Sequence, residues 1–158
     1  MILWRIAAET RRYPADDLSG NGAAKNPGRW NDEGQPVLYT APTIAMAILE
    51  TAAHIDAAGL PLNRFLIRIE VPDASWDARE QASVSSLPPT WSAIPAGKGS
   101  VDVGAAWLRS VRSLVLVVPS VIAPEESTTL INPAHHDAPL LRVDVVRAFE
   151  YERLFRGH

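Results

Sequence analysis

The alternation of apolar and polar residues along the chain predicts a set of short β-strands. In residues 64–71 (RFLIRIEV) every second side chain is apolar, which is typical of a strand with one buried face. Residues 113–118 (SLVLVV) are almost continuously apolar and stop at a proline, as in a fully buried strand. We predict further strands over residues 2–7 and 36–40, with weaker candidates over residues 141–146 and 147–155.

A helical period is clearest over residues 41–59 (APTIAMAILETAAHIDAAG). Pro42 suits the first turn of a helix and Gly59 its end. A second, shorter helix is predicted over residues 102–112. In the first helix a helical spacing of the side chains predicts a buried stripe made of Ile44, Ile48, Thr51 and Ile55.

Strands and helices do not alternate regularly along the chain, which favours the α+β class over a doubly wound parallel sheet. Residues 13–35 and 72–100 are rich in turn-forming residues and are predicted to be irregular. Loops as long as residues 13–35 are usually functional or mobile in compact domains. Because the chain shows neither an internal repeat nor a linker, we expect a single domain over residues 1–158.

Composition and charge exclude several classes of protein. With 47% hydrophobic and 21% charged residues, the chain has the composition of a globular domain and not of a disordered one. Its net charge of −3 argues against a dedicated nucleic-acid-binding protein. The absence of cysteine excludes disulfides and cysteine nucleophiles. No apolar run approaches the roughly 20 residues of a membrane span, and the first residues lack a signal-peptide pattern, so we expect a soluble cytoplasmic protein.

Familiar nucleotide-binding and hydrolase motifs are missing, since the chain has no GxxxxGK[ST], HExxH or GxSxG segment. His135, His136 and Asp137 are residue types that bind metal ions. However, the two histidines are consecutive and lie in a turn-rich segment, residues 132–139. We therefore interpret them as part of a polar surface loop and predict no metal site.

Three charged residues are candidates for a site. Glu50 lies beside the buried stripe of the predicted helix, among small alanines that a ligand could approach, although a solvated helix edge gives the same pattern. Arg29 ends the long glycine-rich loop and could bind a phosphate through two hydrogen bonds. Arg5 interrupts an apolar strand, so it either faces solvent or needs an anionic partner.

Two uncharged residues join them. Tyr39 ends the strand predicted over residues 36–40, where its ring could stack on a flat heterocycle or fill the core. Ser120 follows the buried strand and its proline, where a hydroxyl can bind a ligand or start a turn. Ser113, seven residues upstream on the same strand, is the alternative serine.

Six segments occur in a specific order along the chain: WRI (4–6), LSGNGA (18–23), GRWNDEGQPVLYT (28–40), AMAILET (45–51), VPS (118–120) and NPAH (132–135). Together they resemble the RES domain family, which is named for an arginine, a glutamate and a serine and contains toxins of bacterial toxin–antitoxin pairs. The resemblance extends from Trp4 to the RLF near residue 155 and is weak only over residues 72–112.

The resemblance implies an ADP-ribosyltransferase-like fold, in which two small twisted sheets surround a NAD cleft, and a reaction that cleaves the bond between nicotinamide and ribose. It places the family's functional residues on Arg29, Tyr39, Glu50 and Ser120, and a further arginine on Arg5. Glu50 would stabilise the oxocarbenium-like ribose, and the arginines would bind the pyrophosphate or ribose. Tyr39 would stack near the nicotinamide, and Ser120 would bond the ribose or the carboxamide.

Several alternatives stay open. The acceptor of ADP-ribose could be water or phosphate, which depletes NAD, or a protein target. A non-catalytic binding module on the same fold, or a glycosidase-like hydrolase that pairs Glu50 with Glu70 or Asp56, would fit the same residues. The resemblance also implies a helix-turn-helix antitoxin as partner, expected to block the cleft mouth near Arg29. Self-association within that complex is compatible with it, and direct contact with nucleic acid or a membrane is not expected.

Overall fold

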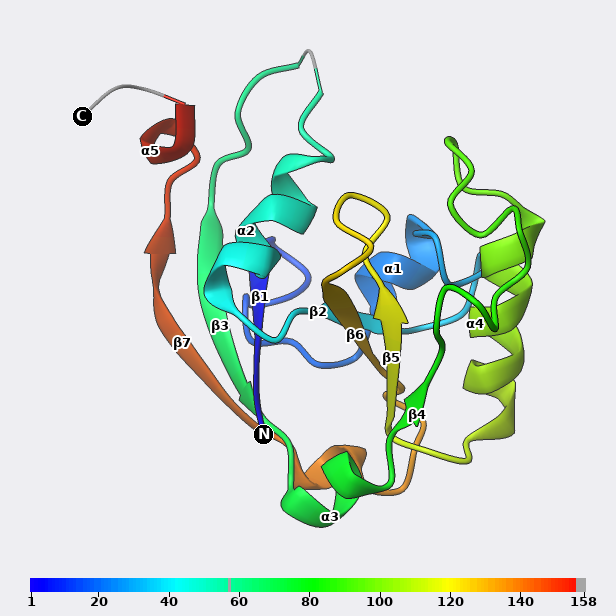
Figure 1. Cartoon of the computed structure of the whole chain (residues 1–158). Helices are drawn as coiled ribbons and strands as arrows, with labels where there is room; N and C mark the ends of the chain where they lie inside the picture. Colours follow the sequence, from blue (N-terminus) through cyan, green and yellow to red (C-terminus); the bar gives the residue numbers. More distant parts are fainter. Residues whose placement is uncertain (57, 156–158) are drawn as a thin grey trace.

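The computed structural model describes residues 1–56 and 58–155, which build two β-sheets (Figure 1). The α+β class with two small sheets is thereby confirmed. The three-stranded sheet has the order β1-β3-β7, with β1 at Ile2–Ala8, β3 at Arg64–Glu70 and β7 at Arg142–Phe149. The four-stranded sheet has the order β2-β6-β5-β4, with β2 at Leu38–Thr40, β6 at Ser127–Ile131, β5 at Val115–Pro119 and β4 at Glu80–Gln81. All pairs are antiparallel except β4 with β5.

The two sheets share one hydrophobic core. Leu3, Ile67 and Ile69 come from the three-stranded sheet and pack with Val115 and Ile131 of the four-stranded sheet, and all five are buried. Backbone hydrogen bonds of 2.9 and 2.8 Å between Trp4 and Ala41 join β1 to the end of β2. This bridge brings the N-terminal strand close to the strand that carries Tyr39.

Two helices pack on the sheets. Helix α2 (Ile44–Ala52) packs Met46 and Ala47 against Ile6 and Leu66 of the three-stranded sheet, and α4 (Lys98–Ser110) packs Trp107 and Leu108 on the four-stranded sheet. In Figure 1, α2 is drawn in front of β1, between the two sheets, and α4 at the outer side of the four-stranded sheet. Short helices lie in the connections: α1 at Asn21–Lys25, α3 at Asp73–Asp77, the 3₁₀ helix η1 at Ala138–Leu140 and α5 at Glu152–Phe155. Within the described residues, none of the helices combines the length and apolar character that crossing a bilayer requires.

The helix predicted over residues 41–59 is shorter than expected. Thr43 caps it by accepting a hydrogen bond from the Met46 backbone N–H at 3.1 Å, and the helix ends at Ala52. Ala53 and His54 are exposed, so a further turn would add little apolar burial beyond Ile55, which already packs on the core, and burial supplies most of a helix's stability. Residue 57 of the predicted segment lies outside the described residues.

Two other predictions need correction, and one strand was missed. The two strands predicted over residues 141–146 and 147–155 are one strand, β7, followed by α5. The helix predicted over residues 102–112 begins earlier, at Lys98. Strand β6 was not predicted, because its buried positions include Thr128 and Thr129, whose polar side chains hide the apolar pattern.

Candidate active site

Glu50 lies where α2 reaches across to the four-stranded sheet. Its side chain is half-buried, and its Oε1 accepts hydrogen bonds from Ser120 Oγ at 2.5 Å and from Thr128 Oγ1 at 3.2 Å. Ser120 follows β5 directly, and Thr128 lies on the neighbouring strand β6. The structure therefore brings the predicted Glu50 and Ser120 together and does not support a freely solvated carboxylate at this position.

The hydroxyl of Ser120 has its hydrogen-bonding capacity filled by the protein. It donates its proton to Glu50 and accepts the backbone N–H groups of Ile122 at 3.1 Å and Ala123 at 3.2 Å. A hydroxyl has one proton and two lone pairs, so a hydrogen bond to a ligand would have to replace one of these three. In this geometry Ser120 orients Glu50 and does not present a donor to a substrate.

Ser113, the alternative serine, lies at the opposite end of β5. Its Oγ accepts the indole N–H of Trp107 at 2.9 Å and donates to Glu80 Oε2 at 2.7 Å. Glu80 is also paired with Arg112 at 2.8 Å. Burial alone would raise the pKa of Glu80, but the hydrogen bonds from Arg112 and Ser113 more than offset this and lower it. Ser113 thus belongs to a separate ion-pair cluster.

Arg29 is the half-buried arginine of the GRWN segment. Its Nη1 donates to the backbone carbonyls of Trp91 at 2.9 Å and Ala93 at 2.8 Å, which ties residues 91–93 to the site. Burial lowers the pKa of the Arg29 guanidinium, and the nearby Glu50 carboxylate and Tyr39 act in the opposite direction. Both hydrogen bonds use Nη1, and the Nε and Nη2 groups of Arg29 donate to no described residue.

Tyr39 is fixed at both its ring and its hydroxyl. The hydroxyl donates to Asn31 Oδ1 at 2.7 Å and accepts the Trp30 backbone N–H at 3.0 Å. Burial raises the pKa of Tyr39 to about 12, although the Trp30 N–H and the Arg29 charge oppose this. Gly28 packs directly on the ring, because a Cβ at that position would lie 2.7 Å from the Tyr39 hydroxyl oxygen.

Asn31, in the same GRWN segment, organises this turn and was not assigned a role from the sequence. It is fully buried, and its Oδ1 also accepts the Gly28 backbone N–H at 2.8 Å. Its amide donates to the carbonyls of Ala23 at 2.9 Å and Gln35 at 3.0 Å. One side chain thus fixes both the loop that carries Arg29 and the hydroxyl of Tyr39. The sequence signal that could have indicated this role is an asparagine next to a tryptophan in a glycine-rich loop.

Arg5 lies on the face of β1 that it shares with the buried Leu3 and Ala7, so it points between the sheets, where its side chain is half-buried. Its Nε and Nη1 are shielded from solvent and donate to no described residue. Burial lowers the pKa of this guanidinium, with the Asp17 carboxylate acting against it. Arg5 lines a cavity of about 290 Å³ together with Tyr13, Asp17, Gly20, Val37 and Tyr39 among others. A buried cation with free N–H groups in a cavity suits an anionic ligand.

A second depression of about 360 Å³ lies between Gln35, Arg109 and Asn132 and contains none of the predicted site residues. Both polar ends of Asn132 are already bonded, its amide to Leu108 O at 3.0 Å and its Oδ1 to the Ala134 N–H at 3.0 Å. The guanidinium of Arg109 on this depression is exposed to solvent, so it needs no ligand to replace lost hydration. The cavity beside Arg5 and Tyr39 is therefore the better candidate for ligand binding, but Glu50, Arg29 and Ser120 are not among the residues that line it.

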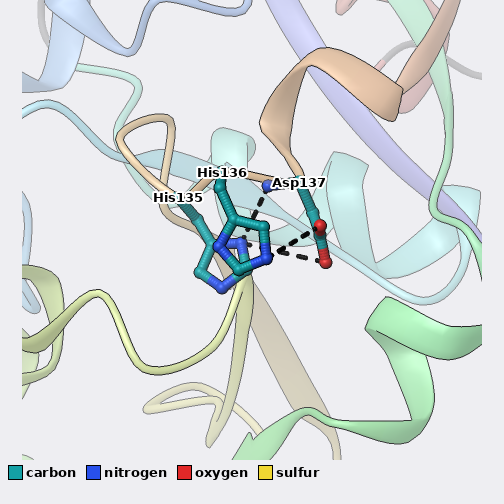
Figure 2. A group of neighbouring side chains, drawn as sticks. All are labelled: His135, His136 and Asp137. Carbon is teal, nitrogen blue, oxygen red and sulfur yellow. Dashed lines mark hydrogen bonds and ion pairs between the residues drawn. The ribbon is translucent and has the colours of Figure 1, made fainter.

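Figure 2 shows His135, His136 and Asp137 turned toward one another. His135 is buried, which the sequence interpretation as a surface loop did not anticipate. Its Nδ1 accepts the Asp137 backbone N–H at 3.1 Å, so the lone pair of this nitrogen is already used within the protein. Asp137 is in turn bonded to His136 at 3.2 Å and to Ser75 of α3 at 2.9 Å. The cluster connects the segment after β6 to α3.

The two-carboxylate alternative finds no support in these contacts. Glu70 is paired with Arg68 at 3.5 Å on the three-stranded sheet, and Asp56 accepts the Ala58 N–H at 2.8 Å beyond the end of α2. Among the described residues, the groups that bond the Glu50 carboxylate are two hydroxyls. Neither Glu70 nor Asp56 is hydrogen-bonded to one of the hydroxyls that hold the Glu50 carboxylate.

Comparisons with known proteins place the chain among toxins. The Prs ADP-ribosylating toxin of Sphingobium sp. (strain YBL2) is 49% identical over 149 residues, which cover 94% of this chain and 92% of the relative. Proteins named Toxin Res from Pseudomonas putida and Yersinia enterocolitica are 38% and 36% identical, covering 98% and 85% of this chain and 100% and 86% of the relatives.

A solved structure has a similar fold. It is the toxin–antitoxin complex MbcT–MbcA of M. tuberculosis, which matches with a TM-score of 0.64 at 19% identity, over 92% of this chain and 84% of the matched chain. A family model described as the RES domain matches residues 2–153, which include every residue of the site described above. The chain belongs to the RES domain family.

Proposed function

We propose that this protein is the toxin of a toxin–antitoxin pair and that it cleaves the nicotinamide–ribose bond of NAD. The observation that carries the proposal is the position of Glu50, a half-buried carboxylate held by two hydroxyls within the electrostatic range of Arg29. The names of the relatives, Toxin Res and Prs ADP-ribosylating toxin, support the same assignment.

The proposed chemistry needs only one carboxylate. The bond between the ribose C1′ and the pyridinium nitrogen breaks, and its electron pair leaves with nicotinamide as a neutral molecule. The sugar is left with a positive charge, which the Glu50 carboxylate stabilises in a partly water-excluded site. Because the leaving group is neutral, it needs no general acid, in contrast to most glycoside hydrolases. The oxygen of the acceptor then forms the new bond to C1′, and its proton passes to solvent water.

The cations and Tyr39 would bind the rest of the substrate. Arg5, with two buried donors facing a cavity of about 290 Å³, suits the pyrophosphate or a ribose oxygen. Arg29 keeps Nε and Nη2 for the same purpose while its Nη1 holds residues 91–93. The fixed ring of Tyr39 lines the same cavity and would stack near the nicotinamide. We propose no metal, since every step above uses side chains of this chain.

Transfer of ADP-ribose to a protein is the second candidate reaction. The name of the Sphingobium relative, which states ADP-ribosylation, favours it. The two reactions share the cleavage step and differ only in whether the acceptor is water, phosphate or a protein side chain. A non-catalytic module would bind NAD and leave it intact.

One experiment separates these reactions. The purified protein is incubated with NAD in phosphate buffer, with and without cell extract, and the products are identified by mass spectrometry. We expect nicotinamide release, together with free ADP-ribose, a phosphorylated ADP-ribose or a modified protein. Glu50→Gln serves as the control. If NAD binds and stays intact under all conditions, the proposed activity is wrong.

We further propose a helix-turn-helix antitoxin as partner and the cytoplasm as the place of action, with residues 1–158 acting as one domain. The similar fold in a toxin–antitoxin complex supports an antitoxin partner. The antitoxin would cover the cleft mouth near Arg29. Co-expression with the helix-turn-helix antitoxin should restore growth of cells that express the toxin, and a failure to do so would contradict the partnership.

A further inference from the structure

The carboxylate of Glu50 is held unequally by its two protein donors. Ser120 and Thr128 both donate to Oε1, at 2.5 and 3.2 Å. Oε2 accepts no hydrogen bond from any residue in the described part of the chain. The two oxygens of this carboxylate are therefore distinct, although a free carboxylate has two equivalent oxygens.

The two donors come from different strands and are each fixed by their surroundings. Thr128 is buried on β6, directly opposite Val118 of β5. Ser120 lies just beyond β5 and is held by the N–H groups of Ile122 and Ala123. A carboxylate that accepts from two separately anchored hydroxyls on one oxygen has little freedom to rotate about its last side-chain bond.

We infer that Thr128 is a positioning residue of the reaction, which together with Ser120 holds Oε1 so that Oε2 of Glu50 faces the sugar. This inference rests on the proposed cleavage of NAD. A single hydroxyl at Ser120 would fix one contact and leave the plane of the carboxylate free to turn. The second hydroxyl, from the adjacent strand, fixes that plane. The oxygen without protein donors is free to approach the positive charge that develops at C1′.

Thr128→Val tests the role, because valine has the shape of threonine and lacks the hydroxyl. Hydrogen bonds to charged groups contribute enough to change a rate by about tenfold or more. We expect kcat for nicotinamide release to fall about tenfold and KM for NAD to change by less than about twofold, since Thr128 acts through Glu50 and not on bound NAD. Thr128→Ser, which keeps the hydroxyl, should restore most of kcat.

A matched control exists on the neighbouring strand. Thr40 is also buried, and its Oγ1 donates to the Thr129 carbonyl at 2.7 Å without contacting Glu50. Thr40→Val should lower the melting temperature and leave kcat unchanged. The double variant Ser120→Ala with Thr128→Val should lose less than the product of the two single losses, because both hydroxyls act on one oxygen.

The outcomes are distinguishable. Wild-type protein that releases no nicotinamide refutes the proposed function, whereas active wild type with a Thr128→Val kcat equal to that of Thr40→Val refutes the role of Thr128. A rise in KM at constant kcat, or no rescue by Thr128→Ser, also refutes it. If Thr128→Val does not fold, Thr128→Ala is measured in its place. A crystal structure of the variant, in which the inference expects a turned Glu50 carboxylate, provides a readout that is independent of activity.

Discussion

Near each end of strand β5 a serine is hydrogen-bonded to a glutamate of another element, and the two pairs differ in their surroundings. At one end Ser120 donates to Glu50, and at the other Ser113 donates to Glu80. Glu80 is bonded directly to Arg112 at 2.8 Å, so its charge is compensated within the cluster. Glu50 makes no ion pair with a described residue within 4.0 Å, and Arg29 acts on it only over a longer distance.

This comparison shows that a serine–glutamate hydrogen bond does not by itself mark a reactive site. At the Glu80 end, Arg112 compensates the charge of the glutamate, and the Ser113 hydroxyl accepts the buried indole N–H of Trp107. The Glu50 end leaves one carboxylate oxygen and several guanidinium donors of Arg29 without partners among the described residues. Unused donor and acceptor capacity, and not the residue pair, separates the two ends.

Exchanging each glutamate for glutamine should give the largest difference in activity between the two ends of β5. Glu50→Gln removes the charge that stabilises the sugar cation and should lower nicotinamide release by about 10²–10³-fold, as expected for loss of a preorganised electrostatic contact. Glu80→Gln should keep the rate within about twofold, because its contacts belong to the structural cluster. Both rates are measured on variants shown by circular dichroism to be folded. Equal rates for the two variants would place the chemistry elsewhere.

High pH should affect the Glu50 end through Tyr39, whose pKa is raised from 10.0 to about 12 by burial. The folded state then holds a proton that the unfolded state releases, so the stabilisation is complete below pH 10 and is lost as the pH rises to about 12. The loss amounts to roughly 2–3 kcal/mol of the free energy of unfolding. Denaturation between pH 9 and 12 should show this decline in the wild type and a smaller one in Tyr39→Phe. Parallel declines in both proteins would mean that Tyr39 is not the titrating group.

Removing each serine hydroxyl should separate activity from stability. Ser113→Ala leaves the Trp107 indole N–H buried without its acceptor, which costs about 1–3 kcal/mol, and should lower the melting temperature with kcat nearly unchanged. Ser120→Ala should lower kcat about tenfold or more, because Glu50 loses its shortest hydrogen bond. Thermal unfolding and nicotinamide release are measured on both variants. The opposite pattern would exchange the roles of the two serines.

The two arginines should give the smallest difference. Arg29→Lys keeps the charge but cannot hold two carbonyls and a ligand in one planar group, so we expect about a tenfold loss of kcat/KM for NAD. Arg112→Ala removes an exposed ion pair with Glu80 and should have little effect on activity. Limited proteolysis near residues 91–93 should accelerate in Arg29→Lys alone. If both variants keep wild-type kcat/KM, Arg29 has no role in substrate binding.

The sequence predicted much of this arrangement, for reasons that particular residues illustrate. The alternation in residues 64–71 and the apolar run at 113–118 correspond to β3 and β5, because burial imposes a two-residue period on strands. The resemblance to the RES family pointed to Arg29, Tyr39, Glu50 and Ser120 as a set, and the structure places Glu50 in contact with Ser120 and near Arg29. Their roles in the reaction remain proposals.

What the sequence did not predict depends on contacts between distant segments. Thr128 meets Glu50 only because β6 pairs with β5, and a threonine in an unassigned segment carries no local sign of that contact. Asn31 differs from other loop asparagines through its burial and its hydrogen bonds to Ala23, Gly28, Gln35 and Tyr39, which the closed loop over residues 23–39 brings around one side chain. His135 is buried because α3 and the segment after β6 meet through Ser75 and Asp137. Local patterns contain no information on these encounters.

The guanidinium of Arg5 lowers the stability of the fold and at the same time offers hydrogen-bond donors to a ligand. A hydrophobic side chain of similar volume at this position would fill the space between Leu3 and Ala7 without desolvating a charge, and replacing buried charges in this way often makes a protein more stable. The fold thus retains a locally frustrated interior position, as natural proteins do where a site needs a group that packing alone disfavours. Any anion that engages those shielded nitrogens would relieve the frustration, so the melting temperature of this protein becomes a reporter of occupancy.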